Sequence, residues 1–159
     1  MNHISWQEYF MFSAVLTSKR SKDPSTQVGA VIVNEDNRIV GTGYNGFPNG
    51  ISDKDLPWTK DSKLFEETKY AYVVHAETNC LLNSISLNLK ECTMYVTLFP
   101  CSSCTKLIIQ RGIKKIVFAN YPKDIESSDN KASIKMLDLA RINYKLYDSI
   151  NNSITLNTK

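Results

Sequence analysis

The sequence predicts a layered α/β domain in which an antiparallel hairpin is followed by parallel strands that alternate with helices. Two patterns indicate this: two apolar runs joined by a short polar turn near the N-terminus, and a helix–strand alternation from residue 76 onward. The 159 residues, 42% hydrophobic and 22% charged, fit one globular domain. With no internal repeat or linker, we expect residues 1–150 to form that single domain and residues 151–159 a loose tail.

The first elements expected are a helix and a hairpin. Residues 5–19 carry apolar side chains at helical spacing, and Ser5 followed by Glu8 has the pattern of a capping box. Val28–Val33 is short, apolar and rich in β-branched residues, which favours a buried strand. After a polar turn, Arg38–Tyr44 is expected to pair with it.

A long loop should follow the hairpin. Residues 45–70 contain repeated turn and helix-breaking signals, such as Asn-Gly and Leu-Pro. A loop of this length inside a compact domain is usually functional or disordered. We interpret it as functional because it adjoins the metal motif described below.

The second half of the chain alternates between helices and strands. The expected elements are a helix over 76–87, a strand over 93–98, a helix over 102–111, a strand over 115–119, a helix over 132–141 and a strand over 142–147. In the first of these helices, four apolar side chains are expected to face inward: Ala76, Cys80, Leu81 and Ile85. This order of elements predicts parallel strands with helical crossovers.

Charge and hydropathy exclude several classes of function. The net charge is +3, and the 19 Lys and Arg residues are scattered, unlike the dense basic stripe of a protein that binds polymeric nucleic acid. A mild basic excess suits a small anionic ligand instead. We find neither a secretory pattern nor a run of about 18 apolar residues, so we expect no membrane association and a cytoplasmic location. In a reducing compartment, closely spaced cysteines indicate metal or redox chemistry.

Three residues have the spacing of zinc ligands. His75 lies at the start of a predicted helix, and Cys101 and Cys104 form a Cys-x-x-Cys pair where a strand gives way to the next helix. A helix N-terminus lowers the pKa of a thiol, and two thiolates with one imidazole suit Zn²⁺. Three protein ligands leave the fourth tetrahedral position to water, as in catalytic zinc sites.

Glu77 is the candidate general acid and base. It lies two residues after His75, close enough to reach a zinc-bound water without binding the metal. From there it can pass a proton to the ring nitrogen and then to the departing amine of a substrate. The combination of His-x-Glu with Pro-Cys-x-x-Cys is the signature of zinc nucleobase deaminases. The sequence therefore predicts hydrolytic deamination.

Other interpretations of these cysteines and histidines remain open in the sequence. The Cys-x-x-Cys pair could be a redox pair, and His75 could be a structural histidine. A structural zinc would need a fourth ligand, which Cys80, Cys92 or His3 could supply. We interpret Cys80 and Cys92 as small buried hydrophobic residues.

Longer segments resemble the deoxycytidylate (dCMP) deaminase family of the cytidine deaminase-like superfamily. The metal motif marks only the superfamily, whereas the Ser-Lys-Asp-Pro, Gly-Tyr-Asn-Gly and Leu-Pro-Trp blocks are typical of the dCMP branch. The similar segments are residues 21–30, 40–48, 52–53, 56–58, 69–79 and 95–101. Together the similarity extends from Ser21 to about Phe118, roughly two-thirds of the chain.

The resemblance implies a fold, a reaction and a regulation. The fold would be a three-layer α/β/α cytidine deaminase-like fold with a five-stranded mixed sheet. Zinc would be bound by His75, Cys101 and Cys104, with Glu77 as proton shuttle. The reaction would convert dCMP to dUMP and ammonia and so feed dTMP synthesis.

Many members are homohexamers regulated by dCTP and dTTP, so we expect a homo-oligomer, with Mg²⁺ accompanying the effector. The candidate residues for the regulatory nucleotide are Tyr44, Asn45 and Gly46.

Several residues are candidates for contacts with the substrate. A 5′-phosphate would suit a segment just past the first helix, although the same charges could simply solvate a helix C-terminus. That segment consists of Arg20, Ser21 and Lys22. Asn45 could bond a sugar hydroxyl or a base edge, or be a left-handed turn residue. Phe99 could stack on the base or pack in the core, and Ala76 is expected to contact the substrate.

Two rival functions share the metal motif. A deaminase of tRNA or single-stranded nucleic acid would need room for a flipped or unpaired base, and its binding would fall steeply with salt. A non-catalytic, zinc-stabilised nucleotide-binding module would show no turnover. The scattered charge argues against the first rival. The second predicts that Glu77→Gln changes neither ligand binding nor any activity, whereas the enzyme should lose nearly all turnover and keep its zinc.

Overall fold

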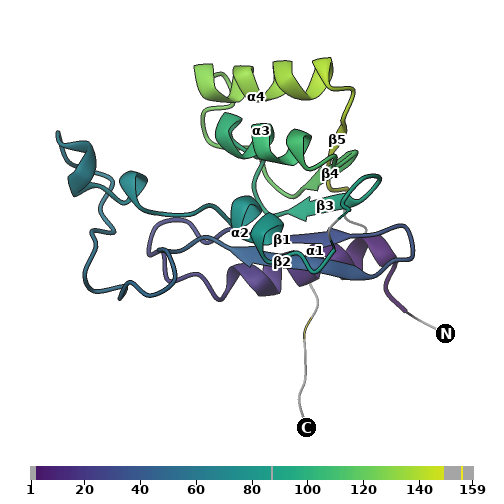
Figure 1. Ribbon diagram of the computed structural model, residues 1–159, viewed down its shortest axis with the longest axis horizontal. Coiled ribbons are helices and arrows are strands. Elements are labelled where there is room, and N and C mark those ends of the chain that lie inside the picture. The colour runs from purple at the N-terminus through teal and green to yellow at the C-terminus, as the bar shows by residue number, and fades with distance from the viewer. Residues whose placement is uncertain (1–2, 87, 149–154, 156–159) are drawn as a thin grey trace, which may run out of the picture.

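A five-stranded mixed sheet forms the centre of the computed structural model, which describes residues 3–86, 88–148 and 155 (Figure 1). The strands are β1 (Gly29–Val33), β2 (Ile39–Tyr44), β3 (Thr93–Val96), β4 (Lys115–Phe118) and β5 (Asn143–Leu146). Their order in the sheet is β2-β1-β3-β4-β5. β1 pairs antiparallel with β2 and β3, whereas β3, β4 and β5 are parallel. The predicted hairpin followed by parallel strands is confirmed.

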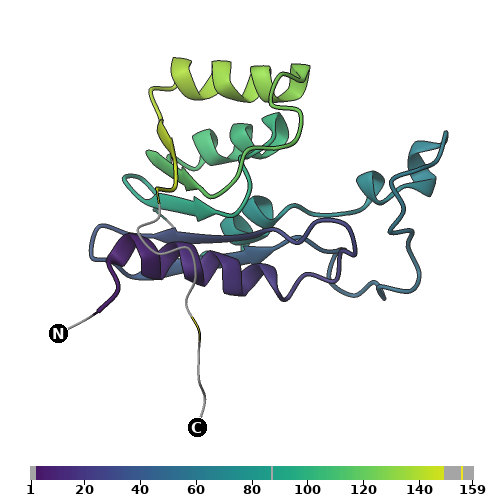
Figure 2. The same cartoon turned by 180° about the vertical axis from the view of Figure 1, so that it is seen from behind.

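Helices cover both faces of this sheet. They are α1 (Trp6–Ser18), α2 (Ala76–Leu82), α3 (Ser102–Gln110) and α4 (Ser128–Leu139). α1 packs on one face through a small apolar cluster that includes Phe10, Ala14 and Val31. α2 and α3 lie on the other face over a larger cluster, and α4 packs beside α3 (Figures 1 and 2). The result is the expected three-layer α/β/α arrangement.

Local sequence signals explain where the helices begin. The Ser5 Oγ accepts the Glu8 N–H at 3.2 Å, and the Glu8 carboxylate accepts the Ser5 N–H at 2.8 Å, so the predicted capping box is confirmed. α4 begins at Ser128, four residues before the prediction, because Ser127 caps it by accepting the N–H of Asn130. The polar composition of this first turn conceals the helix in the sequence.

The end of α2 differs from the prediction. The helix ends at Leu82 rather than at residue 87, which lies outside the described residues. Ile85 was expected to face inward, but it is 85% exposed, so that expectation was wrong. Its N–H donates to the carbonyl of Val40 on β2 at 2.9 Å, an interaction that a continued helix would not allow. The other three apolar residues of this helix are buried as predicted.

Two glycines allow the helices to lie directly on the hairpin. A Cβ on Gly29 would lie 2.2 Å from the Ala14 carbonyl oxygen of α1, and a Cβ on Gly43 would lie 2.2 Å from the Cys80 backbone nitrogen of α2. Any side chain at either position would push the helix away from the strand. The close approach of α2 to β2 fixes the helix whose first residues carry the candidate catalytic groups.

The segment between β2 and α2 projects from the body of the molecule (Figure 1). It contains only two short 3-10 turns, Phe65–Glu67 and Lys69–Ala71. The rings of Phe47 and Trp58 lie 4.1 Å apart within it, and Val74 returns to pair with Gly46. The expected C-terminal tail lies outside the described residues apart from residue 155. In the part of the chain that is described, no helix has the length and hydrophobicity needed to span a membrane.

Candidate active site

Two helix N-termini bring the predicted zinc ligands together. His75 is the N-cap residue of α2, Cys101 is that of α3, and Cys104 lies in the first turn of α3. The His75 Nδ1 lies 3.4 Å from each of the two sulfur atoms. Tetrahedral zinc, with bonds of roughly 2.3 Å to sulfur and 2.0–2.1 Å to nitrogen, would require a separation of roughly 3.5 Å. The donor set and its spacing therefore fit Zn²⁺.

The ligand group has three members in the described part of the chain. The potential ligand atoms of His75, Cys101 and Cys104 lie within 4.8 Å of one another, and no other described residue joins them. Cys80 and Cys92 are buried in the larger apolar cluster, which confirms that they behave as hydrophobic residues. Neither supplies the fourth ligand that a structural zinc would need. The arrangement thus has the three-ligand form of a catalytic site.

The metal-free ligands hold their protons unevenly. The hydrogen bond from Cys104 lowers the pKa of Cys101 to about 4, and the same contact raises the pKa of Cys104 above its ordinary value. The hydrogen bond with Cys101 raises the pKa of His75 to about 9. His75 and Cys104 therefore hold their protons more tightly than Cys101 does. Zinc binding must displace the protons that His75 and Cys104 retain.

Glu77 lies beside the ligands without joining them. It is the second residue of α2, its side chain is buried, and it lines the same cavity as His75 and Cys101. Burial raises the pKa of Glu77 above its ordinary value, although the positive charge of His75 opposes this. A carboxyl group with a raised pKa holds a proton more readily and can both accept and return one. This is the position and chemistry predicted for the acid and base.

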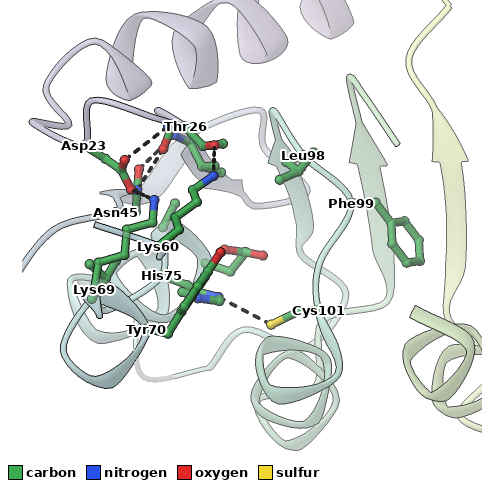
Figure 3. Close-up of a pocket in the computed structure, with 14 residues that line it drawn as sticks. Asp23, Thr26, Asn45, Lys60, Lys69, Tyr70, His75, Leu98, Phe99 and Cys101 are labelled. Atoms are coloured by element: carbon green, nitrogen blue, oxygen red, sulfur yellow. Dashed lines mark hydrogen bonds and ion pairs between the residues drawn. The ribbon is translucent and has the colours of Figure 1, made fainter. Parts of the chain in front are cut away.

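A cavity of about 210 Å³ opens over these groups (Figure 3). One wall is formed by the segment between β2 and α2, which contributes Lys60, Lys69 and Tyr70. Asn45 and Ala76, both predicted to contact the substrate, also line the cavity. The long loop is therefore part of the site, as its interpretation as a functional loop requires.

A buried polar network supports the wall opposite the ligands. The Asp23 carboxylate forms an ion pair with Lys69, and the two side chains are only 1% and 7% exposed. Burial alone would raise the pKa of Asp23, but the hydrogen bonds from Lys69 and from two backbone N–H groups hold it below its usual value. Asn45 donates to Asp23 at 3.2 Å and to the Thr26 carbonyl at 3.0 Å, and its oxygen accepts the Val28 N–H at 2.8 Å. The network joins the segment after α1 to the long loop.

The amide of Asn45 is thus already engaged with the protein. Its backbone φ is not in the left-handed region, so the turn-residue alternative does not hold. Asn45 nevertheless lines the cavity, where a bound ligand would lie within reach of it. A contact between Asn45 and the substrate stays a prediction.

The segment predicted to hold the phosphate lies outside the cavity lining. The Ser21 hydroxyl donates to the Asn45 carbonyl at 2.8 Å and is buried, and Lys22 forms an ion pair with Asp53 on the surface. Arg20 is exposed just after α1. Two of these three residues therefore use their polar groups in contacts within the protein, and a role of the segment in holding the phosphate stays a prediction.

Phe99 borders the cavity, but its ring packs in the core. The ring points away from the other labelled side chains (Figure 3), Phe99 is 3% exposed, and the ring packs against Phe118 with centroids 5.0 Å apart. Tyr121 and Tyr144 complete this aromatic cluster. This packing favours the core alternative, and a contact between Phe99 and the base stays a prediction. Tyr70 is the other aromatic residue of the cavity lining and is 57% exposed.

Sequence reasoning missed part of the cavity lining. Asp23, Thr26, Lys69 and Tyr70 lie in segments that carry the family resemblance, but nothing in their pattern indicates a shared wall. Lys60 lies in the irregular loop, whose path depends on tertiary contacts, so no sequence signal could have found it.

The candidate regulatory residues border a separate surface pocket. Tyr44, Asn45 and Gly46 line it together with Phe47 and the turn that follows. The pocket is predominantly polar, and it lies next to the Lys22–Asp53 ion pair. Its role as a nucleotide site stays a prediction.

Comparisons with known proteins agree with this geometry. The family description "Cytidine and deoxycytidylate deaminase zinc-binding region" matches residues 4–120. Deoxycytidylate deaminase of Pongo abelii is 49% identical over 146 residues, covering 92% of this chain and 82% of that protein, and the Homo sapiens enzyme is 47% identical over the same shares. The crystal structure of a dCMP deaminase from cyanophage S-TIM5 in complex with dCMP and dUMP has a TM-score of 0.71 at 26% identity, covering 91% of this chain and 100% of that one. The chain therefore belongs to the cytidine and deoxycytidylate deaminase family.

Proposed function

We propose that this protein is a zinc-dependent hydrolase that converts dCMP and water to dUMP and ammonia, and so feeds dTMP synthesis. The observation that carries the proposal is the His75–Cys101–Cys104 group with buried Glu77 beside it. His75, Glu77 and Cys101 line one cavity. The substrate class is supported by relatives named deoxycytidylate deaminase that are 47–49% identical to this chain over 146 aligned residues.

Each part of the site has a distinct task. His75, Cys101 and Cys104 would hold the zinc, which when bound lowers the pKa of water to roughly 7 and so supplies a nucleophile at neutral pH. Glu77 takes up the proton that water loses and returns it to the pyrimidine ring nitrogen. The hydroxyl added to C4 then gives up its proton, which Glu77 transfers to the exocyclic amine. The C4–N bond breaks, ammonia leaves, and the C4 carbonyl of dUMP forms. The surrounding walls limit the access of bulk water to the carboxyl group of Glu77, which is 5% exposed.

We assign the 5′-phosphate to Lys60 and Thr26 at the cavity mouth. The Lys60 Nζ lies 3.5 Å from the Thr26 Oγ1, and among the described side chains it forms no ion pair. Lys69 is a weaker candidate because Asp23 already neutralises its charge. The exposed ring of Tyr70 is suited to stack on the base.

Regulation and assembly complete the proposal. The pocket beside Tyr44, Asn45 and Gly46 is the candidate site for a regulatory dCTP or dTTP with Mg²⁺. A homo-oligomer, in particular a hexamer, is the assembly that the family resemblance implies. The cytoplasmic location stays a prediction from the sequence.

A panel of substrates tests the proposed reaction. The purified protein is incubated with dCMP, deoxycytidine, CMP and dCTP, each with and without a chelator, and deamination is followed by the loss of cytosine absorbance. We expect chelator-sensitive turnover of dCMP well above that of the others. If no mononucleotide is deaminated, even with dCTP and Mg²⁺ present, while an oligonucleotide is, then the polymer-acting alternative replaces this proposal.

A further inference from the structure

The first turn of α4 contacts the metal-binding turn. Asp129 accepts the backbone N–H of Ser102 at 3.1 Å through Oδ2 and accepts the Ser102 hydroxyl through Oδ1. Ser102 is the first residue of α3, so its N–H is one of the donors that a helix leaves without an intrahelical partner. A carboxylate 27 residues further along the chain therefore caps the helix that carries both cysteine ligands.

A second contact lies one helical turn further along α4, on the same face. The Ser133 hydroxyl donates to the Pro100 carbonyl at 2.9 Å and lies 2.6 Å from the Thr105 hydroxyl. Since its only proton goes to Pro100, the Thr105 hydroxyl is the donor to Ser133. Ser133 and Thr105 have no exposed surface, so water cannot replace these hydrogen bonds.

The two contacts lie on either side of one zinc ligand. Pro100 precedes Cys101 and Ser102 follows it, so α4 holds the backbone both before and after this cysteine. Cys104 is held differently, because it is only 2% exposed and is surrounded by packed side chains. Cys101 is more exposed and depends more on its backbone for its position. Figure 1 shows α4 lying alongside α3, the arrangement that permits both contacts.

We infer that Asp129 and Ser133 are positioning residues that hold Cys101 in place to bind zinc. Groups that orient metal ligands typically contribute about 10–100-fold in metal affinity. The family match ends at residue 120, before α4 begins, so these contacts lie outside the matched region. The inference rests on the zinc site of the proposed function, but it does not depend on which nucleotide is the substrate.

Zinc affinity of the full-length chain is the direct test. The zinc Kd of the wild type, Asp129→Ala and Asp129→Asn is measured by competition with a chromophoric chelator. We expect the Kd to rise about 10–100-fold in Asp129→Ala. A smaller rise is expected in Asp129→Asn, which keeps one acceptor oxygen. The test uses Asp129 variants because Ser133 is buried, and removing its hydroxyl in Ser133→Ala can prevent folding. Asp129 is exposed, so its variants leave the core intact.

Ser127→Ala is the matched control. It removes the N-cap of α4 without removing any contact to Ser102. We expect its zinc Kd to equal that of the wild type. An equal rise in Ser127→Ala and Asp129→Ala would overturn the inference, because general loosening of α4 would then explain it. An unchanged Kd in Asp129→Ala would also overturn it. A wild-type chain that binds no zinc would overturn the proposed function as well, and so the two failures are distinguishable.

Discussion

Glu77 is the side chain to which the proposed chemistry assigns both proton transfers. Glu77→Gln keeps the shape of the side chain but removes its ability to accept a proton. We expect kcat for dCMP to fall by at least about 10²–10⁴-fold, the usual contribution of general acid–base catalysis. The zinc content, measured by metal analysis, should stay at one ion per chain because Glu77 is not in the ligand group. Loss of zinc along with activity would show instead that Glu77 supports the metal.

The protons on the ligands predict how zinc affinity depends on pH. The pKa of His75 is raised to about 9 and that of Cys104 is also raised, so both groups must lose a proton on binding. Two released protons make the apparent affinity rise about 100-fold per pH unit. This dependence should hold above the Cys101 pKa of about 4 and weaken once the pH exceeds the His75 pKa of about 9. Chelator competition at a series of pH values measures it, and a flat profile would mean that the ligands are already deprotonated.

Lys60 is the residue whose substitution should weaken the reaction of the nucleotide dCMP without affecting that of the nucleoside deoxycytidine. Lys60→Ala removes the proposed partner of the 5′-phosphate, and a charge-assisted hydrogen bond contributes about 1.5–3 kcal/mol. We expect KM for dCMP to rise about tenfold or more, with KM for deoxycytidine unchanged. Lys63→Ala, in the same loop but outside the cavity lining, is the control. Equal effects on both substrates would assign Lys60 to loop structure instead.

The Asp23–Lys69 pair joins two elements, the segment after α1 and the loop before α2. Asp23→Asn leaves the buried Lys69 ammonium without its partner and should destabilise the protein by about 3–5 kcal/mol. Asp53→Asn breaks the exposed pair with Lys22 and should cost only about 0–1 kcal/mol. Urea unfolding of both variants measures the difference. Similar small losses of unfolding free energy in both variants would show that the buried pair does not stabilise the contact between the two segments.

The contribution of the Asp23–Lys69 pair to the free energy of unfolding should depend on pH, in a direction set by the pKa of Asp23. The folded-state pKa of Asp23 is lower than its unfolded value of roughly 3.9. Its contribution to stability is therefore fully present above that unfolded value and is lost as the pH falls through the lower folded-state pKa. The difference in unfolding free energy between wild type and Asp23→Asn should narrow below about pH 4.

The elements show how far the sequence predicts the structure. The hairpin, the order of helices and strands, and the zinc ligands follow from local patterns: β-branched runs, capping residues and ligand spacing. The differences arose where tertiary contacts determine the position of a residue. Ile85 lies outside α2 because its backbone N–H bonds to β2, and the ring of Phe99 packs in an aromatic cluster that other strands and loops supply. Lys60 entered the cavity because of the path of a loop that no periodic pattern describes.

The whole molecule explains why one small domain can hold this site. β1 and β2 carry α2, whose first residues supply His75 and Glu77, and the end of β3 leads into α3 with Cys101 and Cys104. The sheet thus fixes two helix N-termini against each other across a long stretch of sequence. The protein's mild positive charge of +3 suits a mononucleotide better than a polymer.

Titration of zinc into the metal-free protein tests the central claim most directly, with dUMP formation from dCMP measured at each step. We expect turnover to rise in proportion to bound zinc and to reach a plateau at one ion per chain, as the single group of His75, Cys101 and Cys104 among the described residues requires. The same titration of Glu77→Gln should bind zinc equally without producing dUMP. Turnover that does not depend on zinc, or a fully loaded wild-type chain that leaves dCMP unchanged, would contradict the account.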